Sequence, residues 1–145
     1  MAWLIDLTDE RFKIPANADV IDYIARANPF AHSDLGQRLI DLKGGLSEAT
    51  VYSPSFKACA YVVLHNPANV IFALAADMRD LSFRLPLAMH EEIRARGGAN
   101  PSRIGGEWLD VAAFPPGGQT PAGEQRLADY CAAALRHTAM LDSDS

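Results

Sequence analysis

The clearest hydrophobic pattern in the chain lies near its C-terminal end. Apolar residues recur there at intervals of three, four, seven and eight, which is the spacing of one face of an α-helix. Thr120 and Pro121 precede the pattern in the manner of a helix cap and a first-turn proline. The pattern therefore predicts a long amphipathic helix that packs through one stripe, formed by Leu127, Tyr130, Cys131, Ala134, Leu135 and Thr138.

Three shorter stretches before this helix have the pattern of β-strands. Residues 58–64 and 70–75 are rich in β-branched and aromatic residues, and residues 81–85 alternate apolar and polar positions. Short clusters of turn-forming residues separate them. Three strands joined in this way predict an antiparallel meander, and residues 108–114 predict a further strand.

Helical patterns occupy most of the remaining sequence. Residues 19–27 place apolar side chains on one face, and so does a segment for which Ser33 is the expected cap. Residues 87–96, with Pro86 as the expected first helical position, predict a helix inserted between strands. We therefore expect an α+β fold, in which an antiparallel sheet of about four or five strands within residues 50–114 carries N-terminal helices, one inserted helix and a long C-terminal helix packed on the sheet.

The size and composition fit one globular domain. The chain has 145 residues, of which 49% are hydrophobic and 21% charged, so it can bury a core without disulfides or metals. We expect a single α+β domain at residues 1–140 and a disordered polar tail at residues 141–145. No apolar run approaches the ~18 residues that span a bilayer, and the opening residues do not resemble a signal peptide, so we expect a cytoplasmic protein without membrane contact.

The charge argues against nucleic acid as a partner. The formal net charge is −5 and no basic run is present, whereas nucleic-acid affinity depends on clustered lysine and arginine. A small local basic patch remains open, formed by Arg79, Arg84, Arg94, Arg96 and Arg103.

The cysteines and histidines predict no metal site. Cys59 and Cys131 lie in segments that are expected to be buried, and neither forms a Cys-x-x-Cys pair, so both should be reduced and inert. None of the four histidines has the spacing of a metal motif, and we expect them to be solvated; they are His32, His65, His90 and His137. The sequence also lacks nucleotide-binding and esterase motifs, so we expect no cofactor.

The sequence is compatible with two roles for Trp108. It opens a strand after Gly105 and Gly106, so its indole can fill the core or border a ligand cleft, and we favour the core. If a cleft exists, we expect it between the sheet and the last helix. Its candidate ligand-binding residues are Tyr61, Arg84, Trp108 and Tyr130.

Residues 81–135 resemble a family of small bacterial proteins that carry a luciferase-type domain. The resemblance rests on the segments 81–86, 93–101 and 106–109 and on Tyr130 in the final helix. Family members usually have a histidine after the proline of a Gly-Ala-x-Pro segment, where this chain has Ser102. The resemblance implies an α+β fold and no particular mechanism.

The same order of elements, with Trp108 opening a strand, also resembles the YjbR and MmcQ-like group. That resemblance implies a fold compared with frataxin-type proteins and a role in DNA binding.

From the residues alone, we expect a small non-catalytic binding or interaction module whose ligand is unknown. One alternative is a small hydrolase or transferase with its site in the cleft near Trp108. The other is a DNA-binding protein of the YjbR-like type. A homodimer or a different protein partner is left open.

Overall fold

The computed structural model describes residues 10–27, 31–52, 61–76, 79–113 and 120–140. Its helical elements, in chain order, are η2 (Glu10–Phe12), η3 (Pro15–Asn17), α1 (Ala18–Ala27), α2 (Ser33–Lys43), α3 (Leu87–Ala95) and α4 (Pro121–Ala139). Its strands are β1 (Thr50–Tyr52), β2 (Val62–His65), β3 (Ile71–Ala75), β4 (Asp80–Arg84), β5 (Ala99–Pro101) and β6 (Trp108–Ala112). Cys59 and the predicted tail at 141–145 lie outside the described residues.

The predicted α+β fold is confirmed, with an open antiparallel sheet. Over the described residues the sheet has six strands in the order β1-β2-β3-β4-β6-β5. The meander of β2, β3 and β4 is the predicted one, and β6 joins it beside β4 through five residue pairs. The sheet exceeds the expected four or five strands because β1 and β5 are only three residues long, which is too short for an alternating pattern.

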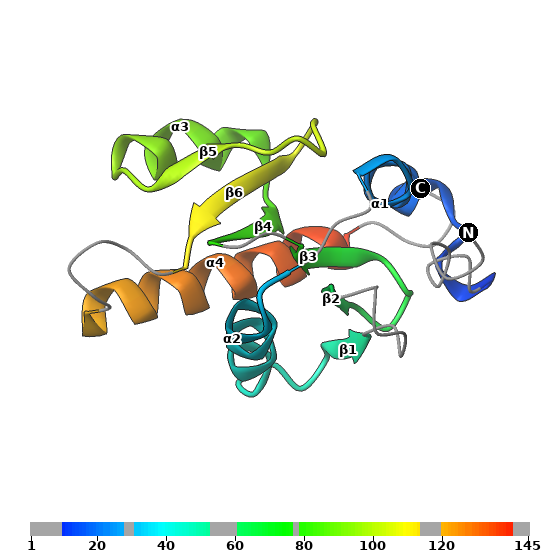
Figure 1. Ribbon diagram of the computed structural model, residues 1–145, viewed down its shortest axis with the longest axis horizontal. Helices are drawn as coiled ribbons and strands as arrows, with labels where there is room; N and C mark the ends of the chain where they lie inside the picture. Colours follow the sequence, from blue (N-terminus) through cyan, green and yellow to red (C-terminus); the bar gives the residue numbers. More distant parts are fainter. Residues whose placement is uncertain (1–9, 28–30, 53–60, 77–78, 114–119, 141–145) are drawn as a thin grey trace.

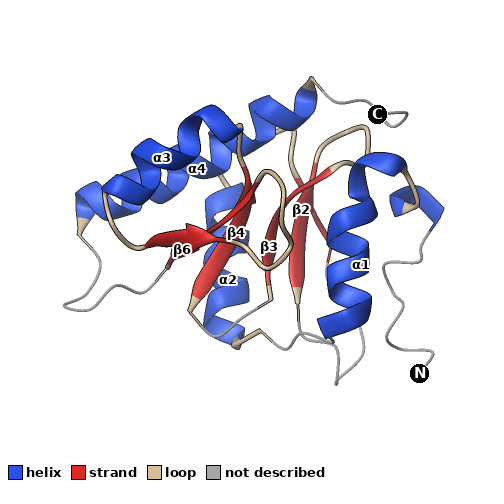
Figure 2. Ribbon diagram, turned by 90° about the horizontal axis from the view of Figure 1, so that it is seen from above, coloured by secondary structure: helices blue, strands red, loops and turns tan. Residues whose placement is uncertain are grey.

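The sheet has an apolar core on each face, and helices cover both (Figures 1 and 2). The first core lies between the sheet and α2, α3 and α4, and the second lies between the sheet and α1 with its 3-10 lead-in. First-core residues include Leu35, Leu39, Val62, Leu64, Phe83 and Leu135. Second-core residues include Phe12, Val20, Ile24, Tyr61, Val63 and Trp108. Because consecutive residues of β2 pack into opposite cores, the strand is buried on both faces, and its first three residues are all apolar.

An irregularity in β3 changes which side chains enter which core. Leu64 pairs with Ala73, whereas His65 pairs with Ile71, so Phe72 is an extra residue on β3. Phe72 and Ala73 consequently both join the first core although they are neighbours in sequence. A β-bulge has this effect, since the extra residue shifts the alternation of faces by one.

Local signals set most helix boundaries, with two corrections. Thr120 caps α4 as predicted, its hydroxyl oxygen accepting from the Gly123 amide at 3.0 Å. The cap of α2 is His32 rather than Ser33, because His32 Nδ1 accepts from the Asp34 amide at 3.1 Å. Pro86 is the cap residue of α3 rather than its first helical residue. Both predictions were one residue off.

The side chain of Asn17 fastens the N-terminal segment to the middle of the sheet. Its amide nitrogen donates to the carbonyl oxygens of Phe12 and Asn69, at 3.1 and 2.9 Å. Its oxygen accepts from the Ile71 amide at 2.8 Å. The residue is fully buried, so these bonds replace hydration that a buried amide would otherwise lose.

Candidate functional site

The four predicted site residues occupy two faces of the sheet. Tyr61 and Trp108 are almost fully buried in the second core, and Tyr130 is buried in the first. Arg84 ends β4 and donates from its guanidinium to the Ala16 carbonyl on the α1 side. The four residues therefore do not share one cleft, because the sheet separates Tyr130 from Trp108. The prediction that Trp108 fills the core is confirmed by its exposure of 1%.

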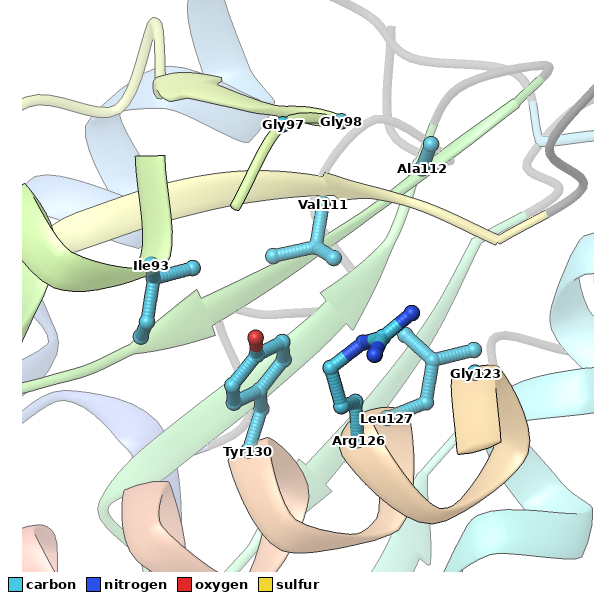
Figure 3. Close-up of a pocket in the computed structure, with 9 residues that line it drawn as sticks. All are labelled: Ile93, Gly97, Gly98, Val111, Ala112, Gly123, Arg126, Leu127 and Tyr130. Carbon is cyan, nitrogen blue, oxygen red and sulfur yellow. The ribbon is translucent and has the colours of Figure 1, made fainter. Parts of the chain in front are cut away.

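Tyr130 lines a hollow of about 100 Å³ between α3, β6 and α4, which we call the α3–α4 hollow (Figure 3). Its apolar walls come from Ile93, Val111 and Leu127. Among the described residues around it, the polar side chains are those of Arg126 and Tyr130. The remaining lining positions are Gly97, Gly98, Ala112 and Gly123.

The chain builds this hollow by ending α3 abruptly and returning as a strand. Gly97 and Gly98 have φ values of +88° and +76°, a conformation that favours glycine. The Gly98 carbonyl then accepts from the Ala112 amide at 2.7 Å, which joins the turn to the end of β6. These two glycines present no side chain, so the space beside Val111 stays unfilled.

The Tyr130 hydroxyl at the hollow is held by Arg96, the residue that follows α3. Arg96 donates from Nη1 to the Tyr130 hydroxyl oxygen at 3.3 Å and from Nη2 to Glu92 at 2.7 Å. Arg126 and Tyr130 are four residues apart on α4, so both side chains reach the same face of the helix. The hollow can thus hold a small molecule between apolar walls and hydrogen-bond donors.

A second polar cluster lies where β4 ends and β6 begins. Glu107 accepts from Arg84 Nε at 3.1 Å through one oxygen and from His137 Nε2 at 2.7 Å through the other. The Nε2 atom of His90 lies 3.0 Å from the carbonyl oxygens of Leu85 and Glu107, to which it donates. We call Arg84, Glu107 and His137 the glutamate cluster. It ties the C-terminal end of α4 to the sheet and, through Arg84, to the segment before α1.

The environment of Glu107 favours its ionised form. Burial raises the pKa of Glu107, but the hydrogen bonds and positive charges of Arg84 and His137 outweigh burial and hold the pKa below its ordinary value. The geometry places a histidine against an oriented carboxylate, which is also the arrangement of a general base and its positioning group.

Two further titratable groups are buried away from both sites. His65 packs its ring edge-on against Phe12 at 5.1 Å between ring centroids, so the expectation that it is solvated is wrong. Burial lowers the pKa of His65, a hydrogen bond to the Asn66 carbonyl raises it, and the charge of Arg11 lowers it further. Cys131 is fully buried as predicted, and burial raises the pKa of its thiol to about 12.

The described residues contain no group of three or more histidine, cysteine, aspartate or glutamate side chains placed to hold a metal ion. Among the described helices, none has both the length and the apolar character needed to cross a bilayer.

Sequence reasoning missed Arg126, Glu107 and His137. Arg126 had a usable signal, because it precedes Tyr130 by one helical turn in a predicted helix. Glu107 is adjacent to Trp108 but lies 30 residues from His137, and no sequence spacing indicates that these two meet.

No family model, curated protein or solved structure matches this chain. The two family resemblances therefore stay predictions.

Proposed function

We propose that this chain is a non-catalytic binding module that takes a small ligand into the α3–α4 hollow. The observation that carries the proposal is a hollow with three apolar walls and two polar side chains at the edge of the first core. Binding sites for small molecules have this composition, with apolar walls for contact area and a few polar groups for orientation.

The volume limits the ligand. A cavity of about 150 Å³ accepts benzene, and the hollow measures about 100 Å³. By this comparison the hollow encloses about four non-hydrogen atoms, so the rest of a longer ligand lies outside it.

The lining supports binding rather than catalysis. Among the described lining residues there is no cysteine, serine, histidine, aspartate or glutamate, which are the usual nucleophiles and bases. The Tyr130 hydroxyl accepts a hydrogen bond from the cation Arg96, and the described lining holds no base to which the hydroxyl could give its proton.

The test is a thermal-shift and NMR screen of the full chain against small acids, amides, alcohols and amines. We expect at least one class to raise the melting temperature and to shift the methyl resonances of Ile93, Val111 and Leu127. Val111→Phe places an aromatic ring in the hollow and should abolish binding, whereas Val111→Ile adds one methyl group and should only weaken it. Near-ultraviolet circular dichroism checks that both variants fold. Unchanged binding by Val111→Phe would contradict the proposal.

A second candidate is the small hydrolase or transferase near Trp108, which one observation favours. His137 Nε2 donates to Glu107 at 2.7 Å, so the Nδ1 of a neutral His137 carries the lone pair of a general base. This candidate predicts that His137→Gln abolishes turnover of any ester or amide substrate found by a chromogenic panel, while ligand binding in the α3–α4 hollow is retained.

The DNA-binding alternative has less support. Two arginines of the basic patch are engaged with carboxylates, Arg84 with Glu107 and Arg96 with Glu92. Such pairing reduces the cationic surface that phosphate contacts require. An electrophoretic mobility shift of DNA by this chain that weakens steeply as salt is added would support the DNA-binding alternative.

A further inference from the structure

We infer that the ligand of the α3–α4 hollow is a short aliphatic carboxylate; the inference rests on the proposed function and specifies its chemistry. The hollow's described polar side chains are those of Tyr130 and Arg126. An arginine only donates hydrogen bonds, and a tyrosine hydroxyl that already accepts one has its proton left to donate. A ligand that meets both has to be an acceptor.

Tyr130 is set up as a donor by its neighbour. Arg96 Nη1 donates to the hydroxyl oxygen at 3.3 Å, so the hydroxyl hydrogen remains for a group inside the hollow. Figure 3 shows the hydroxyl directed between Ile93 and Val111, into the space that they border. The nearby positive charge of Arg96 also favours a negative charge on the group that Tyr130 contacts.

Arg126 is the cation available to an anionic ligand, because the neighbouring acids have other partners. Glu92 pairs with Arg96 at 2.7 Å, and Glu124 pairs with Arg38 at 2.8 Å. Asp129 accepts from Gln125 at 2.9 Å. Arg126 has no ion pair within the described part of the chain, and its planar guanidinium matches a carboxylate in a two-pronged geometry.

The backbone around the hollow also favours a negatively charged ligand. The Gly98 carbonyl, an acceptor that would repel a carboxylate, is engaged by the Ala112 amide at 2.7 Å. Gly123 lines the hollow from the first turn of α4, where the positive end of the helix dipole stabilises anions.

The walls and the volume select the rest of the ligand. Ile93, Val111 and Leu127 offer no polar atom to a second hydrophilic group, so the ligand's body is a hydrocarbon. A hollow of about 100 Å³ encloses a hydrocarbon body of about three or four carbons, with the carboxylate at the polar end of the hollow. Inorganic phosphate lacks this apolar body and would have to shed more hydration, so it should bind poorly.

The experiment is a calorimetric and NMR titration of the full chain with butyrate, butyramide and inorganic phosphate. Butyrate and butyramide have the same shape and differ in charge. We expect butyrate to bind about tenfold or more tightly than butyramide, because the charged form makes the stronger hydrogen bonds. We expect phosphate to compete weakly, and the butyrate affinity to fall as sodium chloride is added.

Two variants and a matched control assign the charge recognition. Arg126→Gln should weaken butyrate about tenfold or more and leave butyramide unchanged, and Tyr130→Phe should weaken butyrate about fivefold. Arg136→Gln removes the same charge from an exposed position ten residues along α4 and should change neither affinity.

The outcomes separate this inference from the proposed function. Equal affinity for butyrate and butyramide, or an unchanged affinity in Arg126→Gln, would overturn the carboxylate inference while the hollow remains a binding site. Tighter binding of phosphate than of butyrate would overturn it too. If no compound of the broader screen binds, or if Val111→Phe binds as well as the parent chain, the proposed function itself fails.

Discussion

The glutamate cluster should stabilise the fold by an amount that can be worked out from its geometry. Glu107 accepts two charge-assisted hydrogen bonds, from Arg84 at 3.1 Å and from His137 at 2.7 Å. The exposed fractions of the three side chains are 31% for Glu107, 13% for Arg84 and 17% for His137. The cluster is thus partly screened by solvent. Its contribution to stability should lie between that of an exposed ion pair, about 0–1 kcal/mol, and that of a hydrogen bond to a buried charged group, about 1.5–3 kcal/mol.

Glu107→Gln keeps the shape of the side chain and removes its charge. We expect the free energy of unfolding to fall by about 2 kcal/mol at pH 7. In a domain of this length, the loss corresponds to a melting temperature lower by roughly 6–8 °C. Urea denaturation followed by far-ultraviolet circular dichroism measures the difference directly.

The stability difference between the parent chain and Glu107→Gln should depend on pH, in a direction set by the pKa of Glu107. Because the pKa of Glu107 in the folded state is below its ordinary value, the unfolded chain takes up the proton first as the solution is acidified. The advantage of the parent chain over Glu107→Gln should therefore be complete above about pH 5 and should shrink as the pH falls below about 4.3, the ordinary pKa of glutamate.

Glu91→Gln is the matched control, since Glu91 is exposed on α3 and its substitution should change the stability by less than about 0.5 kcal/mol. Two results would show that the glutamate cluster does not stabilise the fold in this way. One is a Glu107→Gln variant that is as stable as Glu91→Gln at pH 7, and the other is a stability difference between the parent chain and Glu107→Gln that does not change down to pH 3.

Three further predictions concern buried groups. Cys131 should react very slowly with a thiol reagent at pH 8 in the native protein and rapidly in denaturant, because its thiol pKa is about 12; fast native labelling would contradict its burial. Trp108→Ala should cost about 3–5 kcal/mol, and the emission of Trp108, isolated by Trp3→Phe, should be blue-shifted and resistant to iodide. Since the pKa of His65 is lowered in the fold, stability should decline as the pH falls below about 6.5, and His65→Leu should flatten that decline between pH 7 and pH 5.

The fold was largely predictable because its main signals are local. The stripe and the Thr120 cap predict α4 from residues within one helix, and the alternation at 81–85 predicts β4 and its half-polar face. β5 escaped prediction because Asn100 and Pro101 are poor strand residues that pair only because β6 lies beside them.

The candidate site was less predictable because it depends on contacts between distant segments. Tyr130 was selected from the sequence, but its hollow exists only where α3, β6 and α4 meet. Trp108 and Tyr130 were expected in the same cleft, yet Trp108 packs in the second core and Tyr130 in the first. The side of the sheet on which Trp108 lies follows from the strand register, which depends on pairing with distant strands. His65 was taken as solvated because histidine is usually polar surface, and only the packing of Phe12 over it reveals otherwise.

The bonds of Asn17 have a consequence for how the domain opens. The Ile71 amide belongs to a central strand, yet its hydrogen-bond acceptor is a side chain 54 residues earlier in the sequence. The exchange rate of that one amide proton with solvent therefore reports the free energy at which the segment before α1 detaches. It does not report the free energy of opening the sheet. The same separation delays the contact during folding, because so long a loop must close before the bond can form. The strands of the meander are thus expected to assemble first, and the N-terminal segment to seal the second core as a late step.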